Sequence, residues 1–84
     1  MNAMFTTIHY KVLEVMYDNN VSIAGKEYCP LGQGEIAEKL ELSRAFVNKI
    51  FTELKNAGYI SMVTRGKWKL SDAASEMIRV TQRV

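Results

Sequence analysis

Residues 34–60 read GEIAEKLELSRAFVNKIFTELKNAGYI, and this stretch predicts two short helices joined by a tight turn. The first helix covers residues 33–40, where apolar side chains recur at the spacing of one helical face. Ser43 suits the N-cap of the second helix, because its hydroxyl can accept a hydrogen bond from an unpaired backbone N–H of the first turn. The second helix then covers residues 44–57. Gly58 is expected to end it, since glycine adopts the left-handed conformation at little cost.

The second helix divides into an apolar face and a polar face. Its apolar positions are Phe46, Val47, Ile50, Phe51, Leu54 and Ala57. The opposite side carries Arg44, Ala45, Asn48, Lys49, Thr52, Glu53, Lys55 and Asn56. Phe46 stands at the edge of the apolar arc, so we expect it to pack in the core; the alternative is an exposed contact with a base methyl group or a protein partner.

The sequence after this helix pair has the pattern of a β-hairpin. Residues 59–64 are expected to form a strand, residues 65–67 a tight turn, and residues 68–70 the returning strand. Trp68 and Leu70 point to the same side of that returning strand, because side chains alternate between the two faces. Both are therefore expected to cover the core.

Amphipathic helices are predicted near both ends of the sequence. Over residues 4–17 the apolar arc covers about two thirds of the helix circumference, where one packed face needs little more than about 100°. This excess predicts two buried sides for the first helix. The last helix covers residues 72–84 and is capped by Ser71 or Asp72. Its apolar face comprises Ala73, Ala74, Met77, Ile78, Val80 and Val84.

The connection over residues 19–31 contains Asn-Asn, Gly25 and Pro30, all of them poor helix formers. A short strand is expected within it, at the edge of a sheet, because proline has no N–H to donate. The predicted fold class is α+β, mainly α with a small β-hairpin. Its order is helix, short strand, helix, helix, strand, turn, strand, helix.

The composition is that of one ordinary globular domain spanning residues 1–84. Apolar residues make up 48% of the chain and charged residues 24%. No apolar run approaches the roughly 20 residues that a membrane span requires, and the N-terminus lacks the pattern of a signal peptide. The sequence therefore predicts a cytoplasmic protein with no membrane association.

The sequence contains few of the residues that catalysis or metal binding would need. Cys29 is the only cysteine and His9 the only histidine, so a disulfide within the chain and an all-cysteine metal site are excluded. No paired carboxylates, nucleophile–base set or phosphate-binding glycine loop is evident. We expect no enzyme activity, no metal and no cofactor. Cys29 is expected to be buried or inert, and His9 to be a hydrogen-bonded core or interface histidine.

Positive charge is concentrated in one third of the chain. Residues 43–69 hold six basic residues against Glu53 alone, a net charge of +5. Residues 1–42 carry a net charge of −3, and residues 70–84 are neutral overall. Such an asymmetry favours a polyanionic partner for the basic segment.

Residues 32–70 resemble a winged helix-turn-helix DNA-binding domain of the kind found in MarR-like and other small bacterial transcriptional regulators. The residues that carry the resemblance are Ile36-Ala37, Leu42-Ser43, Val47, Ile50, Leu54, Lys55, Gly58 and Ile60. It implies a helix-turn-helix over residues 33–57 and a wing over residues 59–70. It is specific for the fold and says little about the target.

The resemblance also implies a surface for double-stranded DNA. The second helix would enter the major groove, with the wing against the minor groove or the backbone. Asparagine can pair with adenine, arginine or lysine with guanine, and an alanine methyl can touch thymine. The residues placed at this surface are Ser43, Arg44, Ala45, Asn48, Lys49, Thr52, Lys55, Arg65 and Lys67.

The function expected from these features is sequence-specific DNA binding by a small transcriptional regulator, more often a repressor. It would be a homodimer joined through its N-terminal and C-terminal helices, so that two recognition helices meet successive half-sites. One alternative is a plasmid or phage replication initiator, because Tyr28-Cys29-Pro30 before the first helix of the pair resembles such domains. Another is a protein-interaction module that does not bind DNA, for which exposed Phe46 and Trp68 would argue.

Overall fold

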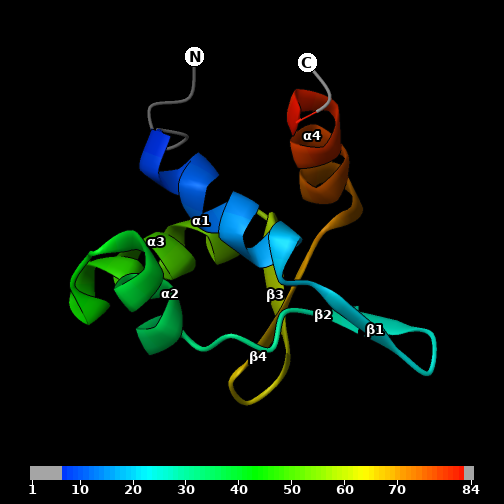
Figure 1. The fold of residues 1–84 in the computed structure, drawn as a ribbon, viewed down its shortest axis with the longest axis horizontal. Helices are drawn as coiled ribbons and strands as arrows, with labels where there is room; N and C mark the ends of the chain where they lie inside the picture. Colours follow the sequence, from blue (N-terminus) through cyan, green and yellow to red (C-terminus); the bar gives the residue numbers. More distant parts are fainter. Residues whose placement is uncertain (1–6, 83–84) are drawn as a thin grey trace.

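The computed structural model describes residues 7–82, which form four helices and two small hairpins (Figure 1). The elements are α1 (Thr7–Asp18), β1 (Val21–Ile23), β2 (Lys26–Tyr28), α2 (Gln33–Leu40), α3 (Arg44–Asn56), β3 (Ile60–Thr64), β4 (Lys67–Leu70) and α4 (Asp72–Gln82). This order confirms the expected α+β class, with one addition between α1 and α2. Among the described helices, none is both long and apolar enough to cross a membrane.

The α2–α3 pair forms as the sequence predicts. Glu41 adopts a left-handed conformation with φ 57° and ends α2, which lets the Leu42 N–H donate to the Ala37 carbonyl at 2.8 Å. Ser43 then caps α3, its hydroxyl oxygen accepting the Phe46 N–H at 3.1 Å. The turn is thus fixed by backbone bonds at one end and a side-chain cap at the other.

The end of α3 is set by Gly58, as expected. Gly58 has φ +84°, and this left-handed step lets the Tyr59 N–H reach back to the Leu54 carbonyl at 2.9 Å. Such a bond satisfies a carbonyl that the last turn of a helix would otherwise leave unpaired. Ala57, which the helical pattern placed on the apolar face, is exposed because α3 ends at Asn56.

Strands β3 and β4 form an antiparallel hairpin with Ile60 opposite Leu70 and Met62 opposite Trp68. The register shifts between Met62 and Thr64, and Gly66 turns the chain with φ +80°. Trp68 and Leu70 are buried on the inner face, which confirms the prediction for both.

The connection between α1 and α2 holds more structure than the single short strand expected. β1 and β2 form a second antiparallel hairpin, with Val21 opposite Tyr28. Beyond β2, Cys29 forms an isolated bridge to Trp68, and the Cys29 N–H donates to the Trp68 carbonyl at 2.6 Å. Since no side chain is needed for these pairings, the residue pattern alone gave little sign of the hairpin.

One hydrophobic core joins all four helices to the β3–β4 hairpin. Its fully buried large side chains include Leu13 and Met16 of α1, Ile36 of α2, Phe51 of α3 and Ile78 of α4. The ring of Phe51 meets that of Trp68 edge-on, with centroids 5.1 Å apart and an interplanar angle of 89°. This is a favourable aromatic geometry, and it fixes β4 against α3.

The outer helices are less buried than the sequence predicts. The apolar arc of α1 buries Val12, Leu13 and Met16 and leaves Ile8, Tyr10, Val15 and Tyr17 half-buried. In α4 only Ala74 and Ile78 are buried, while Ala73 and Val80 are exposed. Ser71, and not Asp72, caps α4 through its hydroxyl oxygen. The remaining positions of these two predicted helices, residues 4–6, 83 and 84, lie outside the described residues.

Candidate nucleic-acid interface

Helix α3 lies across the fold with one face on the core and the other open to solvent. Val47, Ile50, Phe51 and Leu54 are buried, so the positions opposite them face outward. The residues expected to contact DNA are exposed along this helix: Arg44, Ala45, Asn48, Lys49, Thr52 and Lys55, with Ser43 at its start. The structure therefore brings seven of the nine expected residues onto one helix surface.

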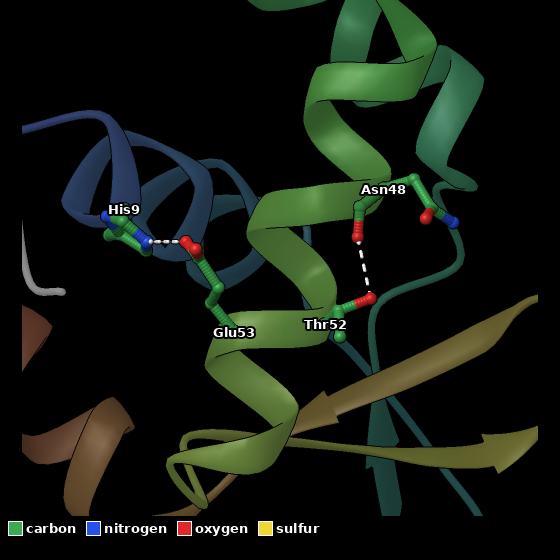
Figure 2. Close-up of polar contacts among 4 residues, drawn as sticks. All are labelled: His9, Asn48, Thr52 and Glu53. Carbon is green, nitrogen blue, oxygen red and sulfur yellow. Dashed lines mark hydrogen bonds and ion pairs between the residues drawn. The ribbon is translucent and has the colours of Figure 1, made fainter.

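The only acidic side chain of residues 43–69, Glu53, turns away from this surface. Its Oε1 lies 2.7 Å from Nε2 of His9 on α1, as Figure 2 shows. An ionised carboxylate has no hydrogen to donate, so Nε2 carries the hydrogen and donates it. His9 is buried at 4% exposure, which confirms the expectation of a hydrogen-bonded core histidine. The charged groups left on the outer face of α3 are all basic.

Two of the expected base-reading side chains lean towards α2. The Asn48 amide nitrogen donates to the side-chain oxygen of Gln33 at 3.0 Å. The guanidinium carbon of Arg44 lies 3.6 Å from the position that a Cβ on Gly34 would occupy. The absence of a side chain at Gly34 thus leaves room for Arg44 beside α2. Sequence reasoning missed Gln33, because no pattern links it to a residue 15 positions away.

The Thr52 hydroxyl already donates its hydrogen within the helix, whereas a phosphate contact would need that hydrogen. The hydroxyl donates to the backbone carbonyl of Asn48 at 3.0 Å, on the flank of α3 away from His9 (Figure 2). Phosphate oxygens only accept hydrogen bonds. In this conformation the Thr52 hydroxyl has lone pairs to offer and no free proton, so a phosphate contact would require it to rotate.

Phe46 does not pack in the core as the sequence led us to expect. It is 37% exposed, on the first turn of α3. A residue at the edge of the apolar face of a helix can be either buried or exposed. Here Val47 and Ile50 are buried in the core and Phe46 is not. Apolar exposure also extends to β3, where Met62 and Val63 are 50% and 39% exposed.

The two basic residues of the wing differ in their surroundings. Arg65 is exposed in the turn between β3 and β4. The Lys67 Nζ lies 5.1 Å from the centre of the Tyr28 ring at the end of β2, a cation–π contact. Tyr28 was missed as a neighbour of this surface, because its position follows from the unpredicted β1–β2 hairpin.

Lys69 belongs to the basic segment in sequence and to another surface in space. It lines a shallow polar hollow between the β1–β2 hairpin and the start of α4, together with Glu27 and Asp72. Lys69 is therefore counted in the basic segment of the sequence but does not belong to the surface formed by α3. Within residues 7–82, no three His, Cys, Asp or Glu side chains cluster in a way that could hold a metal ion.

Cys29 is 1% exposed, and burial raises the pKa of its thiol above the ordinary value of 9.0. The neighbouring Glu35 carboxylate also raises this pKa, against the effect of a backbone hydrogen bond from Leu31. A raised pKa keeps the thiol protonated near neutral pH, and the thiolate is the reactive form. The expected burial of Cys29 is thus confirmed, and its raised thiol pKa is consistent with the expected low reactivity.

Solved structures of regulators share this arrangement over nearly the whole chain. A MarR/EmrR family transcriptional regulator from an Acinetobacter species has a TM-score of 0.72 at 15% identity, covering 94% of this chain and 51% of that one. A mutant of ZitR from Lactococcus lactis has a TM-score of 0.71 at 20% identity, covering 99% and 54%. Reduced HlyU from Vibrio cholerae has a TM-score of 0.72 at 22% identity, covering 96% and 79%.

This is a winged helix-turn-helix fold. The chain spans about half the length of the MarR/EmrR protein and of ZitR. No protein-family model and no curated protein matches the sequence. In this fold α2 and α3 correspond in position to the two helices of the helix-turn-helix, and the β3–β4 hairpin corresponds to the wing.

The winged helix-turn-helix fold also gives the molecule two distinct ends. In Figure 1, α4 and the beginning of α1 lie at one end of the view, and the turn of the wing lies at the other.

Proposed function

We propose that this protein binds double-stranded DNA sequence-specifically and acts as a transcriptional regulator, without enzyme activity. The observation that carries the proposal is the outer surface of α3, where Arg44, Lys49 and Lys55 are exposed and the single acidic residue turns inward to His9. A helix with one cationic face fits the major groove, whose phosphate backbones line both sides. The regulators with the same fold lend this reading support.

The remaining expected contacts follow from the same docking. With α3 in the major groove, Arg65 at the tip of the wing would reach the flanking backbone or minor groove. Lys67 keeps its positive charge above Tyr28 and would contribute to the same contact. The Ser43 hydroxyl accepts a bond from Phe46, so its own hydrogen is available to a phosphate.

The test is fluorescence anisotropy with mixed-sequence duplex DNA across a salt series between about 50 and 200 mM. The double variant Arg44→Ala/Lys49→Ala should bind more weakly than the wild type. Its slope of log affinity against log salt should fall by about one for each phosphate that is no longer neutralised. The matched control is Lys11→Ala/Lys26→Ala, which removes the same charge from α1 and β2. Equal affinity of the two double variants, or no binding by folded wild type at low salt, would refute the proposal.

We further infer a homodimer, with α1 and α4 as its contact surface. Ile8, Tyr10, Val15 and Tyr17 are half-buried on α1, and Val80 is 50% exposed on α4. A dimer would set two recognition helices about 34 Å apart on successive half-sites. Sedimentation at high micromolar concentration tests this; a strictly monomeric protein would contradict it.

Repression is the regulatory direction we favour. A protein bound across a promoter excludes other proteins by occupancy, so repression needs no surface beyond the one that binds DNA. A promoter–reporter pair carrying the selected operator, with and without the protein, decides the direction. Higher reporter output with the protein present would reverse this assignment.

A protein-interaction module remains the second candidate, on one observation. Phe46, Met62 and Val63 are exposed, as such a module would require, but Trp68 is buried and cannot serve it. The replication-initiator alternative drew on Tyr28-Cys29-Pro30, and the bridge of Cys29 to Trp68 gives that segment a structural role. The anisotropy series separates these candidates from DNA binding by α3.

A further inference from the structure

We infer that the first turn of α3 reads thymine through its 5-methyl group, with Phe46 and Ala45 as the specificity-determining residues. This inference rests on the proposed function, because it assumes that α3 enters the major groove. It goes beyond that function by naming the base and the chemical group that are recognised.

The first step is that two polar side chains at this end of α3, those of Asn48 and Arg44, lie towards α2. Asn48 donates its amide to Gln33, and Arg44 lies beside Gly34 at the start of α2. Both side chains lean to the same flank. Ala45 and Phe46, on the same turn of α3, are exposed.

The second step concerns what an apolar side chain can recognise in DNA. The major-groove edges of the bases carry hydrogen-bond donors and acceptors, and the one apolar group among them is the methyl of thymine. Phe46 is 37% exposed, so part of its ring remains available for burial. Burying one methyl group is worth a factor of about four in affinity.

The third step is the charge around this apolar surface. Lys49 follows Phe46 by three residues and Ala45 by four, and residues at these spacings are neighbours on a helix. Lys49 is exposed, and no exposed acidic residue lies on α3 to answer a basic partner. A lysine beside exposed apolar side chains suits a thymine methyl group that lies near phosphates, and the lysine charge would be costly to bury against an apolar protein surface.

The experiment compares two pools of random short duplexes, one made with thymine and one with uracil, which differ only in the methyl group. The wild type is expected to bind the thymine pool at least about fourfold more tightly, which corresponds to one buried methyl. In Phe46→Ala this preference should disappear or fall to the part contributed by Ala45. Ile23→Ala, which truncates an exposed apolar side chain on β1, should keep the full preference.

The outcomes separate this inference from the proposed function. Equal binding of both pools by the wild type would overturn the thymine reading and leave DNA binding intact. A preference that persists unchanged in Phe46→Ala would overturn the role of Phe46, because the discrimination would then come from DNA flexibility or from other residues. No binding to either pool at low salt would overturn the proposed function, and with it this inference. Circular dichroism melts of each variant establish that it is folded.

Discussion

Replacing Glu53 by alanine tests whether the contact between α1 and the recognition helix holds α3 in place. The change removes the acceptor that lies 2.7 Å from Nε2 of His9, whose side chain is only 6% exposed. A buried N–H that loses its acceptor costs about 1–3 kcal/mol. The Glu53 side chain is 35% exposed, so water can partly replace the carboxylate, and we expect a loss near the lower end, about 1.5 kcal/mol.

Thermal unfolding followed by circular dichroism measures this loss. For a domain of this size, about 1.5 kcal/mol corresponds to a fall in Tm of roughly 6–12 °C. The matched control is Glu38→Ala, the same change at an exposed position of α2, which should shift stability by under about 0.5 kcal/mol. Glu53→Gln keeps an oxygen acceptor and should lose less than Glu53→Ala.

A double-mutant cycle ties the effect to this pair of residues. In a His9→Leu background no imidazole N–H remains to be satisfied, so Glu53→Ala should then cost under about 0.5 kcal/mol. Equal destabilisation by Glu53→Ala and Glu38→Ala, or an undiminished effect in the His9→Leu background, would refute the reasoning that this contact anchors α3.

Three further predictions concern single features of the fold. Ser43→Ala should lower the free energy of unfolding by about 1 kcal/mol, because it removes the N-cap of α3. Urea unfolding measures this loss, and an equal loss in the control Ser61→Ala, at an exposed position of β3, would contradict it. Gly58→Ala should cost about 1–2 kcal/mol because φ is +84° with open space around the added Cβ, and an unchanged Tm would contradict the strain. Burial raises the pKa of the Cys29 thiol in the folded protein above 9.0, so on raising the pH the thiol ionises first in the unfolded protein. The free energy of unfolding should therefore decline as the pH rises through 9.0 towards the pKa of the folded state. Cys29→Ala should lack this part of the decline in urea melts, and identical pH profiles would rule it out.

The α2–α3 pair and the β3–β4 hairpin follow from local features of the sequence. Ser43 and Gly58 mark the two ends of α3 through preferences that act within a few residues, the cap and the left-handed stop. The burial of Trp68 and Leu70 follows from strand alternation. By contrast, the β1–β2 hairpin rests on backbone pairing and on the bridge of Cys29 to Trp68, for which side-chain periodicity gives no signal.

The candidate site divides in the same way. The sequence by itself determined which side chains α3 presents, since helical periodicity assigns Arg44, Ala45, Asn48 and Lys49 to the face opposite the core. Only the tertiary structure decided what those side chains meet. Asn48 bonds Gln33 and Glu53 bonds His9 because the packing of α3 against α2 and α1 brings together residues 15 and 44 positions apart. Contacts at such separations depend on how helices pack, and no local propensity encodes them.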